Sequence, residues 1–213
     1  MSEHKASAQG LALELRSVRK SFGKTEIIRG TELAIKAGER VALIGPNGAG
    51  KSTLFNLISG RLPITSGEIL LNGEAIHGMK PYEINRLGLA RSFQVSNLFP
   101  RLSVFENIRC AVLWSMGERY AFWRFLSKLD AVNQRAEEVL DKIRLRRKRD
   151  VHVTSLTYAE QRALEVGVTI AGGGDVILLD EPTAGMSKSE TANFVRMIRE
   201  VTEGKTLLTV EHD

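Results

Sequence analysis

The feature that most constrains the fold is a glycine-rich stretch at residues 45–53, consisting of Gly45, Pro46, Asn47, Gly48, Ala49, Gly50, Lys51, Ser52 and Thr53. It follows the apolar run at residues 41–44 and precedes a second apolar run at residues 54–58, the order expected for a strand, a turn and a helix start. Glycines let the backbone curl so that several N–H groups point at one anion. The pattern therefore predicts a phosphate-binding loop between a strand and a helix.

The residues that begin the predicted helix fit a triphosphate. A helix that starts near Lys51 adds the positive end of its dipole and its unbonded N–H groups. Lys51 supplies a point charge for the β- and γ-phosphates, and the Ser52 hydroxyl can ligate Mg²⁺. A glycine-rich turn that matches the pattern by chance would not be expected between a strand and a helix.

Composition narrows the class of protein only slightly. The 213 residues carry a net charge of +5, which weakly favours an anionic ligand or surface. Cys110 is the only cysteine, so no intrachain disulfide can form and a reducing compartment fits. No apolar run approaches the roughly 18 residues that a membrane span needs, and no signal-peptide core follows the N-terminus. Residues 1–10 are polar and small, and we expect them to be disordered.

The alternation of apolar and polar residues predicts the other elements. In the first half of the chain we expect an antiparallel pair of strands at 11–22 and 25–35, a helix at 52–60, a strand at 67–73 continued at 74–76, a helix at 81–87 and a strand at 88–93. Later we expect a helical stretch at 103–145, helices at 158–170 and 188–202, and strands at 175–180 and 206–210. Strands that alternate with helices predict an α/β fold with a mostly parallel central sheet.

A second chemical signal follows the predicted strand at residues 175–180. Four apolar residues lead directly into Asp180 and Glu181, which places both acids at the carboxyl edge of the sheet, where nucleotides bind in α/β folds. Asp180 would hold Mg²⁺ through water, and Glu181 would orient or deprotonate an attacking water. The alternative is a strand that leaves the core through an acidic turn at Pro182.

Together these motifs resemble the nucleotide-binding domain of an ATP-binding-cassette (ABC) transporter, over nearly all of residues 11–213. The resemblance implies a P-loop NTPase (ABC ATPase) fold: a mostly parallel core sheet, an N-terminal antiparallel β-subdomain and an inserted helical subdomain at about residues 95–165. Residues 91–94 resemble the family's Q-loop, in which the side-chain oxygen of Gln94 would touch Mg²⁺ or the attacking water. Without the family, Gln94 would be a surface amide at a strand end.

Residues 156–162 resemble the family's signature motif, usually Leu-Ser-Gly-Gly-Gln. The resemblance implies that the helix start here faces the γ-phosphate bound by the other subunit. Thr157 and Glu160 also form a capping box, which needs no ligand. Ala159 replaces a glycine: it fits without strain if the position is helical, and costs about 1 kcal/mol or more if the position needs a positive φ.

Three further segments match the family in order. Phe22 stands where an aromatic residue stacks on adenine, although it could simply pack at a strand end. Residues 184–187 resemble the loop that contacts the partner subunit, with Ser187 in place of a frequent Asp. His212 matches the switch histidine, which would hydrogen-bond the γ-phosphate and link it to Glu181. Because related domains continue further, we expect the C-terminal end of this domain to be truncated.

The resemblance implies a set of site residues. We expect Glu181, His212 and Gln94 to be catalytic, and Ser52, Gln94 and Asp180 to hold Mg²⁺. The residues expected to bind ATP are Phe22, Gly45, Asn47, Gly48, Ala49, Gly50, Lys51, Ser52, Thr53, Thr157, Ala159 and Glu160.

The implied function is that of a Mg-dependent ATPase subunit of an ABC transporter. Two such subunits, identical or not, would enclose two ATP molecules and drive integral membrane permease subunits, with a periplasmic solute-binding protein as an indirect partner. The chain would be cytoplasmic and peripheral on the inner membrane. Its motifs look most like those of bacterial importers of branched-chain amino acids and related amides, on residues 92–94, 98–100, 160–165 and 180–186.

Two other functions stay open at this point. The basic run at residues 144–149 favours a soluble ABC-type ATPase that acts on nucleic acid or ribosomes, although such a run is usually a solvated face and nucleic acid is not the expected partner. Ala159 and the short C-terminus favour instead a module that binds nucleotide without turnover.

Overall fold

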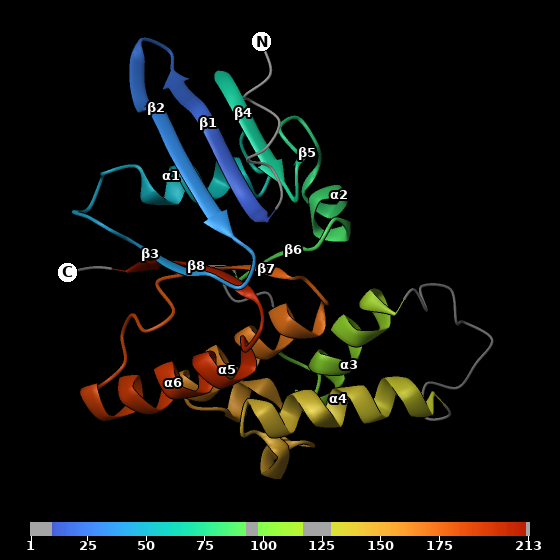
Figure 1. The fold of residues 1–213 in the computed structure, drawn as a ribbon. Helices are drawn as coiled ribbons and strands as arrows, with labels where there is room; N and C mark the ends of the chain where they lie inside the picture. Colours follow the sequence, from blue (N-terminus) through green and yellow to red (C-terminus); the bar gives the residue numbers. More distant parts are fainter. Residues whose placement is uncertain (1–9, 93–97, 117–128, 212–213) are drawn as a thin grey trace. The chain divides into compact units, whose positions relative to one another are not determined.

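The structure is a computed structural model that describes residues 10–92, 98–116 and 129–211 (Figure 1). The chain forms two compact units. The first unit contains residues 1–91, 174–182 and 204–213, and the second contains residues 92–173 and 183–203. The predicted domain boundaries stay a prediction.

An antiparallel sheet forms the N-terminal part of the first unit. The described residues place its strands in the order β2 (Thr25–Lys36), β1 (Leu11–Phe22), β4 (Ser66–Leu71) and β5 (Glu74–Ala75). Leu15 pairs with Leu33 on one side and with Ile69 on the other. The alternation of apolar and polar residues therefore predicted both long strands and their antiparallel pairing correctly.

A parallel sheet forms the rest of the first unit, in the order β3 (Arg40–Ile44), β8 (Thr206–Glu211), β7 (Val176–Asp180) and β6 (Leu89–Arg91). All three neighbouring pairs are parallel, with Asp180 beside Val210 and Ile44 beside Glu211. Because parallel strands end at the same edge, the residues that follow β3 and β7 are brought together. This confirms the predicted α/β fold with a mostly parallel core sheet.

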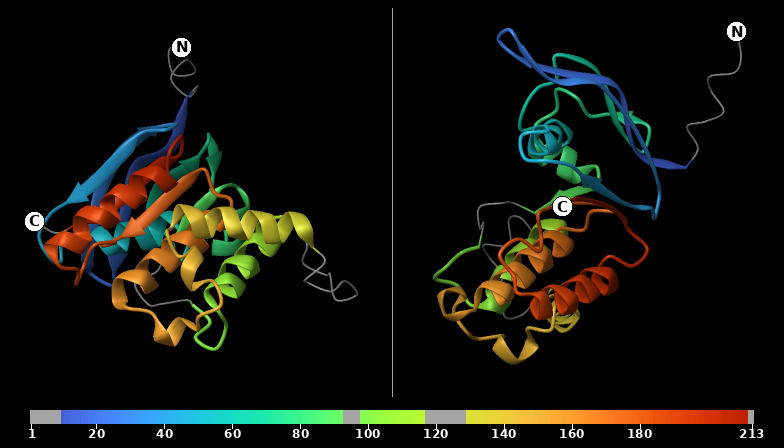
Figure 2. Two further views of the ribbon diagram at one scale, coloured as in Figure 1. Left: turned by 90° about the horizontal axis from the view of Figure 1, so that it is seen from below. Right: turned by 90° about the vertical axis from the view of Figure 1, so that its left-hand side faces the viewer.

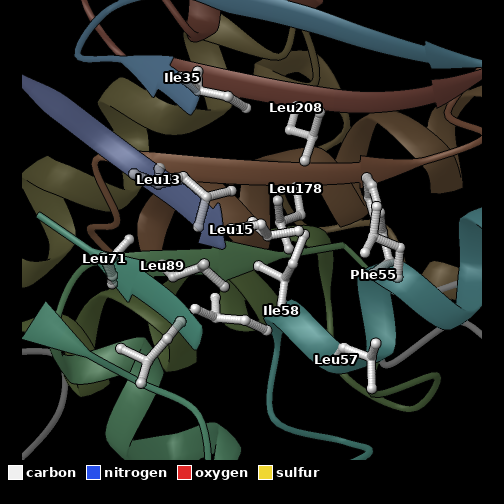
Figure 3. Packing of buried hydrophobic residues seen from close by; sticks show 14 of the residues in the cluster. Leu13, Leu15, Ile35, Phe55, Leu57, Ile58, Leu71, Leu89, Leu178 and Leu208 are labelled. Carbon is white, nitrogen blue, oxygen red and sulfur yellow. The ribbon is translucent and has the colours of Figure 1, made fainter. Parts of the chain in front are cut away.

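The core of the first unit packs the first helix against strands from both of its sheets. Helix α1 (Lys51–Ile58) buries Phe55 and Ile58 completely in one cluster with Leu15 and Leu178, and Figure 3 shows Ile58 close to these two leucines. The short helix α2 (Pro81–Arg86) adds Ile84 to the same cluster. Each such side chain contributes about 1.5–3 kcal/mol on burial, so the helix after the phosphate loop is held firmly.

The second unit is helical in the residues described. It contains α3 (Val104–Ser115), α4 (Asp130–Lys142), α5 (Tyr158–Ala171) and α6 (Lys188–Val201), with short turns of 3₁₀ helix, η3 (Arg146–Lys148) and η4 (Val153–Ser155), between α4 and α5 (Figure 2). Helix α3 packs on α4 and α5, and α5 packs on α6. The predicted apolar face is buried at Val132, Ala136, Val139 and Leu140, whereas Leu126 lies outside the described residues.

A close approach of β4 to β1 makes glycine necessary at position 67. Gly67 has φ +94°, and a Cβ there would lie 2.4 Å from the backbone oxygen of Ser17. We expect Gly67→Ala to lower the free energy of unfolding by more than the about 1–2 kcal/mol of a left-handed alanine. Gly73→Ala is the matched control, since Gly73 has φ +83° and open space at its Cβ. Equal losses in chemical denaturation of the two variants would show that the backbone contact costs nothing.

Candidate functional site

The phosphate loop connects β3 to α1 and curls as the sequence predicts. Gly48 and Gly50 have φ +82° and +90°, in the left-handed region that favours glycine. The Ala49 N–H donates to the Pro46 carbonyl at 3.2 Å, which closes a turn inside the loop. A Cβ on Gly50 would lie 2.9 Å from the terminal Cδ1 of Ile28, which would have to shift, so it is the backbone conformation that requires glycine at this position.

Helix α1 differs from three other helices of the chain at its N-terminus. Helices α3, α5 and α6 begin with capping boxes, Ser103 with Glu106, Thr157 with Glu160, and Ser187 with Glu190. Helix α1 instead begins after Gly50, with no side-chain cap and no acidic residue in its first turn. Uncapped N–H groups and the positive end of the helix dipole together make a site for an anion.

Lys51 lies across the loop that precedes it. Its ammonium group donates to the carbonyl oxygens of Gly45 and of Pro46, the second at 3.0 Å. The charge that the sequence assigned to a phosphate is therefore held over the curled backbone of the loop.

The loop forms one wall of a pocket of about 360 Å³. The residues that line it are Phe22, Ile27, Asn47, Gly48, Ala49, Gly50, Lys51, Ser52, Thr53 and Glu181. The structure thus brings together the phosphate loop, the aromatic residue and one of the two acids that the sequence singled out. Gly45 takes part through its carbonyl oxygen, which accepts the bond from Lys51.

Glu181 is aimed by an unusual backbone conformation. It follows β7 directly and has φ +46°, a left-handed value that is uncommon for a residue other than glycine. Its N–H donates to the carbonyl oxygen of Val210 at 3.0 Å, which fixes the turn. Strained backbone of this kind concentrates at functional sites, and here it places a carboxylate beside the phosphate loop.

The apolar side of the pocket comes from the antiparallel sheet. Phe22 is the last residue of β1 and is 47% exposed, with the Lys20 ammonium 4.9 Å from its ring centroid. Ile27 on β2 lies in the same pocket and is also partly exposed. An exposed aromatic ring beside an apolar side chain offers a stacking surface for a base. The sequence did not single out Ile27, since an isoleucine in an alternating strand carries no signal of a ligand.

Asp180 lies at the end of β7 and is fully buried. It does not line the pocket. Its Oδ2 accepts a bond from Nη2 of Arg91 at 3.2 Å, and the side chains of this ion pair are 0% and 7% exposed. Burial lowers the pKa of the Arg91 guanidinium below its ordinary value, although the Asp180 carboxylate works against that change.

The residues of the signature-like segment lie at the start of α5, in the second unit. Thr157 is the N-cap, and its hydroxyl accepts from the Glu160 N–H at 3.4 Å. Ala159 is helical and has no positive φ, so it fits without strain. Burial would raise the pKa of Glu160, but its hydrogen bonds from Lys148 and Thr157 outweigh burial and lower that pKa below its ordinary value.

The loop at residues 184–187 contacts the same helix start. The Tyr158 hydroxyl donates to the Ala184 carbonyl at 3.0 Å and accepts from Nε of Arg162 at 3.1 Å. Ser187 caps α6, with its hydroxyl 2.6 Å from the Glu190 carboxylate. The two segments that are predicted to face a partner subunit are therefore joined within one chain.

Two of the predicted site residues, Gln94 and His212, lie outside the described residues. Their roles stay predictions, as do the individual roles assigned to the other site residues. Arg91 contacts Asp180, a role that the sequence analysis did not assign to it. The sequence placed Arg91 only as the first residue of the Q-loop-like segment at 91–94, and it ends the short strand β6.

The comparisons with known proteins agree with this geometry. Residues 28–184 match the family described as ABC transporter. The ribose import ATP-binding protein RbsA 2 of Escherichia coli O157:H7 is 33% identical over 201 residues, 94% of this chain and 38% of that protein. The ribose import ATP-binding protein RbsA of Streptococcus agalactiae serotype Ia is 28% identical, over 95% of this chain and 40% of that protein. The chain thus spans about two fifths of the length of these relatives.

Solved structures share the fold. The ADP conformation of MJ1267, an ATP-binding cassette of an ABC transporter, has a TM-score of 0.81 at 25% identity and covers 95% of this chain and 81% of that one. The ATP-binding cassette MJ0796, a dimer bound to ADP and Pi in a post-hydrolysis state, has a TM-score of 0.78 at 26% identity, with 94% and 88% covered. Fold, phosphate loop and family match lead to one assignment: this chain belongs to the ABC transporter family and carries the ATPase domain of that family.

Proposed function

We propose that this chain binds and hydrolyses ATP and thereby powers an ABC importer. The observation that carries the proposal is the pocket in the first unit, in which the phosphate loop, Phe22 and Glu181 line one space. The relatives named as ribose import ATP-binding proteins support the importer class.

Each group of residues in the pocket is suited by its chemistry to a different part of ATP. The N–H groups at the start of α1 and the ammonium of Lys51 would bind the phosphates, and Phe22 would stack on the base. Glu181 would orient the attacking water and take its proton, since a carboxylate beside the γ-phosphate position is suited to that step. Gln94 and His212 are proposed to contact the γ-phosphate region, as the resemblance implies.

The donor set of the first unit fits Mg²⁺. The described residues hold no group of three or more His, Cys, Asp and Glu that could bind a metal alone. Mg²⁺ keeps several waters and is commonly held by one or two protein oxygens together with substrate phosphates. Ser52 and Asp180 would supply those oxygens, with Gln94 as a third contact. Bound there, the ion would neutralise charge that develops on the phosphates.

The proposed assembly contains two ATPase subunits and membrane permeases. The related cassette MJ0796 is described as a dimer bound to ADP and Pi, which supports a dimer here. In it, Thr157, Ala159 and Glu160 of one subunit would face the ATP of the other. Across residues 10–92, 98–116 and 129–211, no helix has both the length and the apolar character of a membrane span. From the family resemblance we propose a location on the cytoplasmic face of the membrane, through contact with the permeases.

Two classes of solute are candidates for the proposed importer, amino acids and sugars. The sequence resemblance favoured branched-chain amino acids and related amides, but the relatives described above are named for ribose import, so the comparisons support import without supporting amino-acid specificity. Copurified permeases and ATPase stimulation by ribose or by leucine, each with its binding protein, would separate the two classes.

The basic run at residues 144–149 does not favour the nucleic-acid alternative. Arg144 pairs with Glu200 at 2.9 Å, and Lys148 pairs with Glu160 at 2.6 Å. Arg149 pairs with Glu137 at 2.6 Å, and its guanidinium lies 4.0 Å from the ring centroid of Phe105. These three cations are paired with acids of the helical unit, although their side chains remain partly exposed, so less of their charge is available to a phosphate backbone.

The proposal is tested by ATP binding and turnover of the purified full chain with Mg²⁺, alone and with its copurified permeases. Binding followed by release of phosphate supports it. A folded chain that binds no ATP would overturn it. ATP binding without hydrolysis in the presence of the permeases would favour the alternative function, a module that binds nucleotide and does not hydrolyse it.

The helical position of Ala159 gives a specific prediction for the signature-like segment. We expect Ala159→Gly to leave ATPase activity equal or higher, because the smaller residue removes no contact group. The free energy of unfolding should fall by about 0.5–1 kcal/mol, the usual cost of glycine in a helix. Steady-state turnover and thermal denaturation measure the two effects. A large loss of activity at unchanged stability would show that the methyl group is needed and contradict the signature reading.

A further inference from the structure

Arg91 makes a set of buried contacts that the proposed function does not use. It is the last residue of β6, and its side chain is 7% exposed. Nη1 donates to Oδ1 of Asn56 at 2.8 Å and to Oγ of Ser59 at 2.7 Å, while Nη2 donates to Oδ2 of Asp180 at 3.2 Å. The guanidinium also lies 5.6 Å from the ring centroid of Phe55.

These contacts join three elements of the first unit. Asn56, Ser59 and Phe55 belong to α1 or its C-terminal cap, and α1 begins at the phosphate loop. Asp180 ends β7, and Arg91 itself ends β6. A guanidinium is a rigid fork with five donors, so one arm can hold α1 while the other holds the carboxylate.

A buried charge pair alone would not require this arrangement. Neutralising Asp180 needs only one cation, yet Nη1 of Arg91 donates hydrogen bonds to two neutral acceptors of α1 and its cap. Those bonds fix the plane of the guanidinium, and a fixed plane restricts where Oδ2 of Asp180 can lie. Partners that orient a metal ligand in this way commonly change metal affinity 10–100-fold when removed.

We propose that Arg91 is a positioning residue that holds the Asp180 carboxylate at a fixed position relative to α1 and its phosphate loop. This inference rests on the proposed function, in which Asp180 helps to hold the Mg²⁺ that accompanies ATP. Arg91 acts through Asp180 and touches neither nucleotide nor metal.

The test measures Mn²⁺, a spectroscopic substitute for Mg²⁺, by electron paramagnetic resonance on the full chain with a non-hydrolysable ATP analogue. We expect Arg91→Met to weaken Mn²⁺ binding about 10–100-fold while binding of the analogue in EDTA changes less than about twofold. Arg16→Met is the matched control, since Arg16 is an exposed arginine that pairs with Glu14 and Glu68. Unchanged Mn²⁺ binding in Arg91→Met would overturn the proposal. Tighter Mn²⁺ binding would also overturn it, because it would mean that Arg91 competes with the metal for Asp180.

A double-variant cycle separates positioning from general stability. If Arg91 acts through Asp180, then Arg91→Met combined with Asp180→Asn binds Mn²⁺ no more weakly than Asp180→Asn alone. Additive losses would contradict this. Arg91→Lys should restore part of the affinity, because a lysine can reach the carboxylate but cannot form the fork.

A milder variant covers the case in which Arg91→Met does not fold. Ser59→Ala removes one of the two α1 acceptors and leaves the ion pair with Asp180 in place. We expect a smaller but measurable loss of Mn²⁺ affinity in that variant, and no loss would overturn the proposal. A wild-type chain that binds no ATP analogue in EDTA would instead contradict the proposed function, so the two failures are distinguishable.

Discussion

Glu181→Gln is expected to bind ATP with the affinity of the wild-type chain and to lose nearly all turnover. The amide keeps the size of the side chain and its place in the pocket, but it cannot accept the proton of the attacking water. General-base catalysis contributes about 10²–10⁴-fold, so phosphate release should fall by that factor. The measurement is steady-state phosphate release together with equilibrium binding of ATP.

The same variant should accumulate an ATP-bound dimer, because the step that leads to opening is blocked while phosphate binding remains. Light scattering coupled to size exclusion would detect the dimer. Glu74→Gln is the matched control, since Glu74 is an exposed acid on β5 of the same unit. Turnover equal to wild type in Glu181→Gln would remove Glu181 from the mechanism.

Lys51→Ala is expected to lose most of the affinity for ATP. A hydrogen bond to a charged group contributes about 1.5–3 kcal/mol, which corresponds to a dissociation constant about 10- to 150-fold higher. The loop also loses the bonds from the ammonium to the Gly45 and Pro46 carbonyls, so its curl is less well fixed.

Calorimetry of ATP binding to Lys51→Ala measures that loss. Lys36→Ala serves as the control, because Lys36 is an exposed lysine at the end of β2 in the same unit. If ATP bound to Lys51→Ala as tightly as to the wild-type chain, the phosphates would not lie on this loop.

Much of the first unit could be predicted because its signals are local. The strand at residues 11–22 was predicted with the bounds that β1 has, since alternation of apolar and polar residues reports one buried face. The phosphate loop and the two acids at the end of β7 are runs of neighbouring residues, and parallel strands bring their ends to one edge of the sheet.

The contacts that sequence reasoning missed depend on distant partners. Arg91 and Asp180 are 89 positions apart, and no residue near Arg91 predicts that β6 and β7 are neighbouring strands. Ile27 lines the pocket only because β2 carries it there. The basic run was expected to be a solvated face, and Arg144 and Arg146 are indeed exposed. What the sequence could not assign were its acidic partners, since Glu200 is 56 positions away from Arg144.

The contact between Tyr158 and the loop at residues 184–187 has a consequence for how such chains diverge. A Cβ on Gly185 would lie 3.3 Å from the Tyr158 ring, and the Tyr158 hydroxyl donates to the neighbouring Ala184 carbonyl. Gly185 also has φ +78°, a left-handed value that favours glycine whatever residue stands at 158. The backbone conformation and the nearby ring therefore both favour glycine at 185. We expect homologues to keep glycine at 185 even where the residue at 158 is smaller than tyrosine.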